Sequence, residues 1–330
     1  MRSFAEFLIW IINAFDQSNS SELHLLMLKY IYSIFIAWYL FSCKTEPIPF
    51  HQEANEIIIP DFTFKLIHNL PFQLSESSGL CYTDGNLWSF NDAGNSNTLY
   101  RIDTTNGAIL QTLTIENQLN SDWEDISADS LYIYIGDFGN NDGNRNNLKI
   151  LKIKKNDIDL SLSNQKVTAE TIHFSYADQL SLEKNTNSNY DCEAMVSVGD
   201  FLYIFTKNHS DLQTRCYRIS KVPGEYSVSP IRAFNTSGKV TAAAYNTTTK
   251  ELALLGYMNQ KIRPFIWFFS AIEGDDFFGG KAIRKNLDST SRVWQTEGLD
   301  FKDGNNLFLS NEAAEVPAGL FKITYPTKKQ

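Results

Sequence analysis

The sequence predicts an all-β protein built from one repeated four-stranded unit. From residue 62 onward, short runs rich in valine, isoleucine, threonine and aromatic residues alternate with glycine, asparagine and aspartate, and long helical periodicity is missing. In each repeat a small or acidic pair opens a short strand, and a strongly apolar second strand then ends in polar residues. Units of about 40 to 50 residues with four strands are typical of propeller blades. We therefore expect a β-propeller.

Five copies of this unit follow one another along the chain. Measured at the residue that opens the first strand, successive copies begin 46, 69, 49 and 55 residues apart. The 69-residue interval can hold one degenerate blade or only a polar insert around LSLEKNTNSNY, so six blades remain the alternative to five. The aligned opening residues are Ser78, Glu124, Glu193, Ala242 and Glu297.

The expected strands follow the turn residues in each copy. Turns such as Asp84–Asn86 and Asp303–Asn305 separate first strands from second strands. In order along the chain, the copies contain SSGL, LWSF, LYRID and ILQTLTI; WEDI, LYIYIGD, NLKILKIKK and TIHFSY; CEAM, FLYIFTK and RCYRIS; TAAA, ELALLGY and PFIWFFSA; TEGL, NLFLSNE and GLFKITY.

The last copy has no fourth strand of its own. The segment FTFKLIHNL at residues 62–70 is predicted to pair with GLFKITY and to close the ring between the two ends of the domain. Closure matters because an unpaired edge strand invites aggregation. The sequence thus predicts one propeller domain over residues 62–326, preceded by a proline-containing tether at 44–61.

Residues 1–43 have the character of an export signal. The apolar run IYSIFIAWYLFS follows Lys29 and is shorter than the roughly 20 residues that a membrane-spanning helix needs. Its end, LFSC, resembles the lipobox of bacterial lipoproteins, which implies that Cys43 is lipidated and becomes the mature N-terminus. The alternative is a pair of short membrane-associated helices at 7–15 and 28–42. Because MLKYIYSIF has the form of a signal-peptide start, we expect translation to begin at Met27 and residues 1–26 to be spurious.

The predicted location is therefore the cell envelope. An exported lipoprotein of a Gram-negative bacterium faces the periplasm or sits on the outer membrane, and its partner there is the membrane that receives the lipid. The net charge of −9 and the pI of about 5.1 argue against nucleic acid as a partner, because an acidic surface repels phosphate backbones.

Known catalytic and metal motifs are missing from the sequence. It contains no CxxC pair, HExxH, GxSxG, P-loop or GxGxxG motif, so it does not decide whether the protein is an enzyme. Cys81, Cys192 and Cys216 fall on predicted strands and are expected to be buried thiols.

Two positions in each blade are candidates for a functional site. The first is the start of the innermost strand, and the second is the end of the next strand, and both should converge around the central opening if the blades superpose. The second position carries Asp92, Asp137, Lys207, Tyr257 and Glu312. The predicted ligand-binding set is Glu124, Glu193, Glu297, Asp92, Asp137, Arg145, Lys207 and Glu312, with Glu124, Asp137, Glu193 and Glu297 as metal ligands.

So many carboxylates around one opening repel each other, and cations or hydrogen-bond donors must offset this repulsion. Arg145 and Lys207 are candidate internal partners, and Ca²⁺, which takes six to eight oxygen ligands, is the only cofactor that the pattern suggests. Three interpretations stay open: the glutamates clamp backbone N–H groups of the neighbouring blade, they bind a ligand or cation, or a carboxylate pair hydrolyses a glycoside.

Five segments together carry a family resemblance: ESSGL, SDWEDIS, YIGDFGNNDGNR, YDCEAM and TEGLDF. Over roughly residues 62–325 the chain resembles exported bacterial propellers of unknown function, near the SdiA-regulated and the phytase-like or esterase-like propeller families. The resemblance implies a propeller with a polar central site, and Ca²⁺-dependent phosphoesterase activity is known among the phytase type. We expect a membrane-anchored binding or scaffolding protein for a small molecule, glycan or protein. A Ca²⁺-dependent hydrolase, a phosphoesterase or glycosidase, is the alternative.

Overall fold

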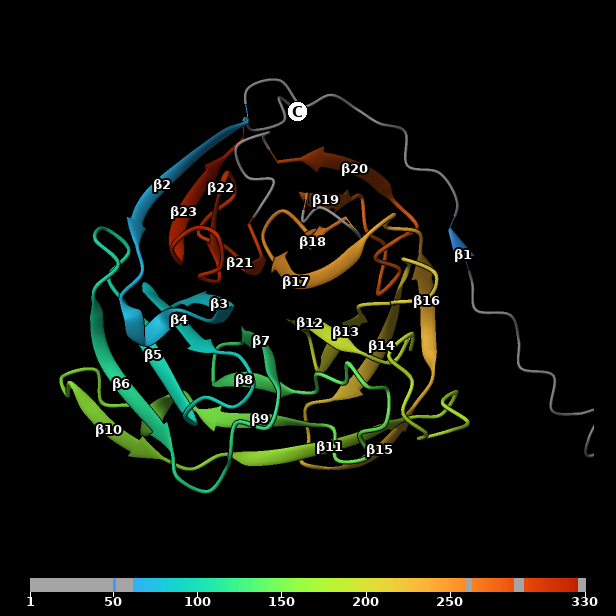
Figure 1. Ribbon diagram of the computed structural model, residues 1–330, viewed down its shortest axis with the longest axis horizontal. Coiled ribbons are helices and arrows are strands. Elements are labelled where there is room, and N and C mark those ends of the chain that lie inside the picture. Colours follow the sequence, from blue (N-terminus) through green and yellow to red (C-terminus); the bar gives the residue numbers. More distant parts are fainter. Residues whose placement is uncertain (1–49, 52–61, 259–262, 288–293, 326–330) are drawn as a thin grey trace, which may run out of the picture. The chain divides into compact units, whose positions relative to one another are not determined.

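The innermost strands of five β-sheets surround a common centre (Figure 1). The computed structural model describes residues 50–51, 62–258, 263–287 and 294–325, and each innermost strand there contacts the next one around the ring. The prediction of a five-bladed β-propeller is confirmed. In ring order, the innermost strands are β3 (Ser77–Thr83), β7 (Trp123–Ala128), β12 (Cys192–Val198), β17 (Lys239–Asn246) and β21 (Thr296–Phe301).

Each blade continues outward through three more antiparallel strands. Blades 1 and 2 add β4 (Asn86–Asn91), β5 (Thr98–Ile102) and β6 (Ile109–Ile115), and β8 (Tyr132–Asp137), β9 (Lys149–Lys154) and β11 (Glu170–Tyr176). Blades 3 and 4 add β13 (Phe201–Thr206), β14 (Thr214–Ser220) and β16 (Pro230–Phe234), and β18 (Glu251–Tyr257), β19 (Pro264–Ser270) and β20 (Lys281–Asn286). Blade 5 adds β22 (Asn306–Asn311), β23 (Gly319–Thr324) and β2 (Thr63–Asn69).

Blades 1 to 3 carry a fifth strand on their outer edge, and this strand runs parallel to its neighbour. β10 (Asn164–Val167) leaves blade 2 to pair with β6 of blade 1, and β15 (Gly224–Val228) leaves blade 3 to pair with β11 of blade 2. β1 (Phe50–His51) pairs with β16 in the same way. These strands cover edges that would otherwise be open. The long interval between the second and third repeats is filled by β10 and the loop 177–191, so the six-blade alternative is wrong.

The outermost strand of blade 5 comes from the opposite end of the domain. β2 pairs antiparallel with β23, from Thr63 opposite Thr324 to Asn69 opposite Gly319. The Phe64 ring on β2 stacks on Phe321 of β23 with centroids 4.9 Å apart. How far the ring depends on this strand is a prediction that a deletion can test.

The core consists of apolar clusters between neighbouring blades. Between blades 1 and 2, for example, Phe90 meets Trp123 edge-on with centroids 5.5 Å apart. The inner strands approach so closely that a Cβ on Gly298 of blade 5 would lie 2.8 Å from Cγ of Leu80 of blade 1, which explains the glycine of TEGL.

The expected buried thiols are confirmed, because Cys81, Cys192 and Cys216 are all buried and unpaired. In the ranges that the structure describes, none of the helices has the length and apolar character needed to cross a membrane. Cys43 and the predicted signal and tether segments lie outside the described residues.

Candidate metal centre

The innermost strands share an irregularity close to their first residue. There, each skips one or two residues in its pairing with the second strand, which is a β-bulge. A bulge redirects the side chain out of the regular ladder, so these residues occupy equivalent places at one end of the inner strands. The skipped residues are Ser78 with Gly79, Glu124, Glu193, Thr241 and Glu297.

In blade 4 the β-bulge lies one residue earlier than the repeat alignment predicted. Thr241 is the skipped residue, whereas Ala242 pairs regularly with Leu255. The Thr241 hydroxyl donates to the carbonyl of Thr296 at 2.7 Å, and the Ser78 hydroxyl donates to the carbonyl of Glu124 at 3.0 Å. Among the residues at the bulges, the two hydroxyl residues are therefore the ones that bond to the backbone of the next blade.

The second predicted position also needs a correction in blade 2. Asp137 pairs with the residue just before the bulge, as Thr206 and Asn311 do in blades 3 and 5. Lys207 and Glu312 follow those residues, so the place equivalent to theirs in blade 2 belongs to Phe138. The alignment of Asp137 with Asp92, Lys207, Tyr257 and Glu312 is wrong by one residue. Asp137 itself pairs with the residue before the bulge, whereas the other four each follow the residue at that place.

Asp137 lies in a buried ion-pair group instead. Its carboxylate is 2.8 Å from Nη2 of Arg145 and 3.6 Å from Nζ of Lys149, and it accepts the backbone N–H of Asp122 at 3.2 Å. Arg145 also reaches the Asp122 carboxylate at 3.6 Å and donates to the carbonyl of Gly139 at 2.6 Å. Asp137 and Arg145 therefore support the segment that carries Asp122.

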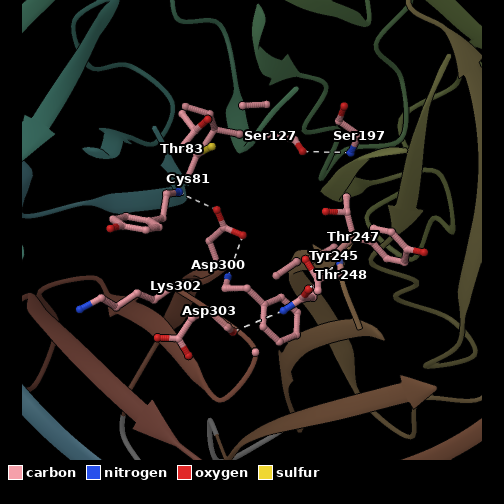
Figure 2. A pocket seen from close by; sticks show the side chains of 18 residues that line it. Cys81, Thr83, Ser127, Ser197, Tyr245, Thr247, Thr248, Asp300, Lys302 and Asp303 are labelled. Carbon is pink, nitrogen blue, oxygen red and sulfur yellow. Dashed lines mark hydrogen bonds between the residues drawn. The ribbon is translucent and has the colours of Figure 1, made fainter. Parts of the chain in front are cut away.

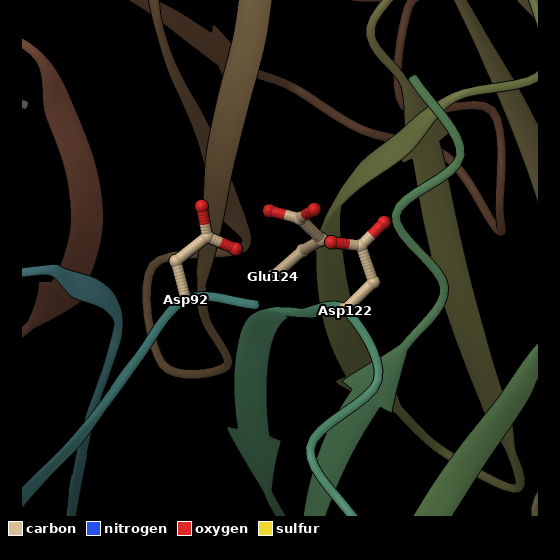
Figure 3. Close-up of side chains that lie close together, drawn as sticks. All are labelled: Asp92, Asp122 and Glu124. Atoms are coloured by element: carbon tan, nitrogen blue, oxygen red, sulfur yellow. The ribbon is translucent and has the colours of Figure 1, made fainter. Parts of the chain in front are cut away.

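Three carboxylates converge at the bulge end of the axis (Figure 3). Asp92, Asp122 and Glu124 each offer an oxygen, and these oxygens all lie within 4.8 Å of one another. Asp92 follows β4 of blade 1, and the other two lie at the start of β7 in blade 2. Of the predicted metal ligands, only Glu124 belongs to this group; Asp137, Glu193 and Glu297 do not.

Of these three carboxylates, Glu124 is the one without a hydrogen-bond donor or ion-pair partner for its negative charge. Its side chain is almost entirely buried, with 4% exposure. Among the described residues, no side chain or backbone N–H donates a hydrogen bond to its carboxylate, and no lysine or arginine pairs with it. Figure 3 shows that it points toward Asp92 and Asp122. A buried charge without a partner is costly unless something supplies positive charge.

The electrostatics of the three carboxylates agree with this geometry. Burial raises the pKa of Glu124 well above its usual range, and repulsion by Glu193, Asp92 and Asp122 adds to the effect. Burial and the nearby Asp92 raise the pKa of Asp122 to about 7, although Arg145 opposes the change. Burial also raises the pKa of Asp92.

Gly139 explains the glycine that follows Asp137 and Phe138 in the motif GDFGNN. A Cβ at this position would collide with Oε1 of Glu124, and it would lie 2.5 Å from Oδ2 of Asp122. A Cβ at this position would push the two carboxylates away from their present positions. The loop that contains GDFGNN therefore packs its backbone at Gly139 against the two carboxylates.

A second group of charges lies beside the three carboxylates. Lys207 is buried, and its ammonium is 2.9 Å from the Glu193 carboxylate. Burial alone would lower the pKa of Lys207, but Glu193, Tyr257 and Glu297 raise it well above its usual range. Burial raises the pKa of Glu297 to about 7, and burial together with Glu297 raises that of Glu312 to about 9. The structure thus brings together Asp92, Glu124, Glu193, Lys207, Glu297 and Glu312.

Sequence reasoning missed Asp122 and a polar chain behind it. Asp191 accepts the N–H of Asn140 at 2.6 Å and contacts Nε2 of His209 at 2.9 Å, and His209 Nδ1 is 3.1 Å from Nζ of Lys239. The available signal for Asp122 was its place in SDWEDIS, two residues before Glu124, because residues two apart in an extended segment share a side.

Comparison with known proteins adds no family. No family model matches the chain, and no curated protein matches it. Among similar solved structures is the PQQ-bound aldose sugar dehydrogenase of Streptomyces coelicolor, with a TM-score of 0.49 and 12% identity over 82% of this chain and 100% of that one.

Two further solved structures are similar at the same level. The apo-form of the soluble aldose sugar dehydrogenase of Escherichia coli has a TM-score of 0.46 and 11% identity, covering 81% of this chain and 100% of that one. An exo-β-1,3-galactanase of Phanerochaete chrysosporium with β-1,3-galactotriose has a TM-score of 0.48 and 10% identity, over 79% of this chain and 64% of that one. Similarities this remote carry no argument about function.

Proposed function

We propose that this protein is a cation-dependent binding propeller that holds Ca²⁺ with Asp92, Asp122 and Glu124. The observation that carries the proposal is the buried Glu124 carboxylate, which among the described residues has no hydrogen-bond donor and no cation at ion-pair distance, and which faces two further carboxylates. A divalent cation supplies the missing positive charge. The ligand then binds through the coordination positions that the protein leaves open.

The spacing and chemistry of the three carboxylates fit this ion. Two oxygens on one Ca²⁺, each at about 2.4 Å, are at most about 4.8 Å apart, and the three groups lie within that limit. Calcium takes six to eight oxygens. Three carboxylates therefore leave positions for water or for oxygens of a ligand.

Calcium binding by calorimetry tests the proposal. We expect Glu124→Gln and Asp122→Asn each to weaken Ca²⁺ binding by more than about 100-fold, because even indirect support of a metal ligand is worth about 10–100-fold. In EDTA, Glu124→Gln should melt at or above the wild-type temperature, since the Glu124 carboxyl group has no hydrogen bond or ion pair to lose and its charge is costly there. With saturating Ca²⁺ the wild-type protein should melt at a higher temperature than Glu124→Gln.

Asp200→Asn is the matched control, because this carboxylate is exposed on the turn before β13. It should leave both calcium affinity and melting temperature unchanged. If the wild-type protein does not bind Ca²⁺, or if Glu124→Gln lowers the melting temperature equally with and without calcium, Glu124 has a structural role and the proposal is wrong.

A Ca²⁺-dependent hydrolase is the second candidate function. It is favoured by Glu312 and Glu297, which lie near the three carboxylates. These two carboxyl groups repel each other, and the charge of Lys207 acts on both. A carboxyl group that keeps its proton can act as a general acid. In the same calcium experiment, turnover of p-nitrophenyl phosphate or p-nitrophenyl glycosides that EDTA stops would assign catalysis; binding without turnover favours the first candidate.

The propeller is further proposed to be displayed on a membrane of the cell envelope through a lipid on Cys43. The support is the apolar run that ends in LFSC. Several acyl chains hold a protein on a bilayer without a spanning helix, because each buried CH₂ contributes about 0.8 kcal/mol. Mass spectrometry of the native N-terminus should find an acylated Cys43, whereas a chain that still begins at Met1 would contradict the proposal.

A further inference from the structure

A cavity of about 430 Å³ lies at the end of the inner strands opposite to the three carboxylates (Figure 2). All five inner strands contribute to its lining near their C-terminal ends, among them Cys81, Ser127, Ser197, Tyr245 and Asp300. Its size falls in the usual range of small-molecule sites, about 300–1,000 Å³.

The side chain of Asp125 bridges the inner strands between the cavity and the three carboxylates. Its carboxylate belongs to blade 2, yet it accepts the N–H of Met195 in blade 3 at 2.7 Å and that of Ala243 in blade 4 at 3.2 Å. Asp125 is fully buried. The cavity and the three carboxylates are therefore two separate places, one on each side of this residue.

Asp300 gives the cavity a fixed hydrogen-bond acceptor. Its Oδ2 accepts the N–H of Tyr82 at 2.6 Å, and its Oδ1 accepts the N–H of Phe301 at 2.8 Å. These bonds hold the carboxylate in place but leave a lone pair on each oxygen. Within the described parts of the chain, no lysine or arginine pairs with Asp300. Burial raises its pKa to about 7.

Ser127 gives the cavity a free hydroxyl donor. Its oxygen accepts the N–H of Ser197 at 3.0 Å, which leaves its own proton available (Figure 2). A ligand oxygen in the cavity can accept this proton.

We propose that this cavity is a second binding site, which takes a small neutral molecule rich in hydroxyl groups. A hydroxyl group both donates and accepts, so it matches an Asp300 carboxylate and a Ser127 hydroxyl at once. A charged Asp300 repels anions. The N–H groups of Tyr82 and Phe301 already bond to it, and burial raises its pKa to about 7, so it does not need a cation at its side. This site is independent of the calcium proposal.

Ligand-observed NMR and calorimetry on the full chain test this site with defined probes: myo-inositol, glucose and galactose as neutral polyols, putrescine as a cation and gluconate as an anion. At least one neutral polyol should bind more tightly than putrescine and gluconate. Asp300→Asn should weaken that binding by more than about 10-fold, and Ser127→Ala by about 3- to 10-fold, consistent with the loss of one hydrogen bond.

Ser127→Ala is the safer variant for folding, because it removes the acceptor of one backbone N–H, that of Ser197, whereas Asp300→Asn alters the acceptor of two. Both variants should keep the wild-type response to Ca²⁺, and Asp200→Asn should bind the polyol as the wild-type protein does. The proposal is overturned if no polyol binds at 10 mM-scale concentration, roughly the weakest affinity of interest. It is equally overturned if putrescine or gluconate binds best, or if binding survives both substitutions.

Discussion

Replacing Asp125 with alanine is expected to lower the free energy of unfolding by about 4 kcal/mol, because each buried donor left without an acceptor costs about 1–3 kcal/mol. This carboxylate accepts three backbone N–H groups, from Ile126, Met195 and Ala243, and so joins blade 2 to blades 3 and 4. Alanine leaves all three donors unpaired in a site that water does not reach. Urea denaturation measures the loss.

Asp200→Ala provides the comparison, since exposed substitutions usually stay within about 0.5 kcal/mol of the wild-type stability. Asp125→Asn should fall between alanine and wild type, because the amide keeps one acceptor oxygen but turns an N–H₂ group toward a donor. A loss below about 1 kcal/mol for Asp125→Ala would mean that the blades are held together by their apolar clusters alone.

Deletion of β2 is expected to lower the melting temperature by more than about 10 °C, since 1 kcal/mol corresponds to about 2–4 °C in a domain of this size class. The clean comparison is between a chain that starts at residue 62 and one that starts at residue 70, because only the second lacks β2. The shorter chain loses the ladder to β23 and the stack of Phe64 on Phe321.

The shorter chain should also associate with itself. β23 would become an open outer edge, and open edges pair with other chains. Light scattering at matched concentrations distinguishes the two truncated chains. Equal melting temperatures would show that the ring does not depend on this strand, and the predicted closure would then be wrong.

The fold was predictable because its signals are local. Strands of blade 1 such as LWSF and ILQTLTI could be recognised from alternation and from turns like Asp84–Asn86, without knowledge of what packs against them. The repeat then implied a propeller, which the structure confirms. The number of blades stayed open because β10 leaves blade 2 to join blade 1, and this exchange lengthens one repeat without adding a blade.

The candidate site was predictable only in part. Glu124, Glu193 and Glu297 could be aligned from sequence, and the bulges place them equivalently. Ala242 was misaligned because no change in residue type marks the bulge residue. Asp137 was misaligned because its residue type does not show which residue of a second strand pairs just before the bulge. A one-residue shift is enough to move a side chain from the axis into an ion pair.

Alternation, turn residues and spacing are properties of neighbouring residues, so they were enough for the strands, the repeats and the acidic character of one end of the ring. Which carboxylates meet is a property of the closed ring. Asp122 faces Asp92 because blades 1 and 2 are neighbours around the axis, and Glu124 is left uncompensated because Lys207 is taken by Glu193. The cavity with Asp300 exists because five strands end around one point. No pattern along the chain shows which strand ends come together.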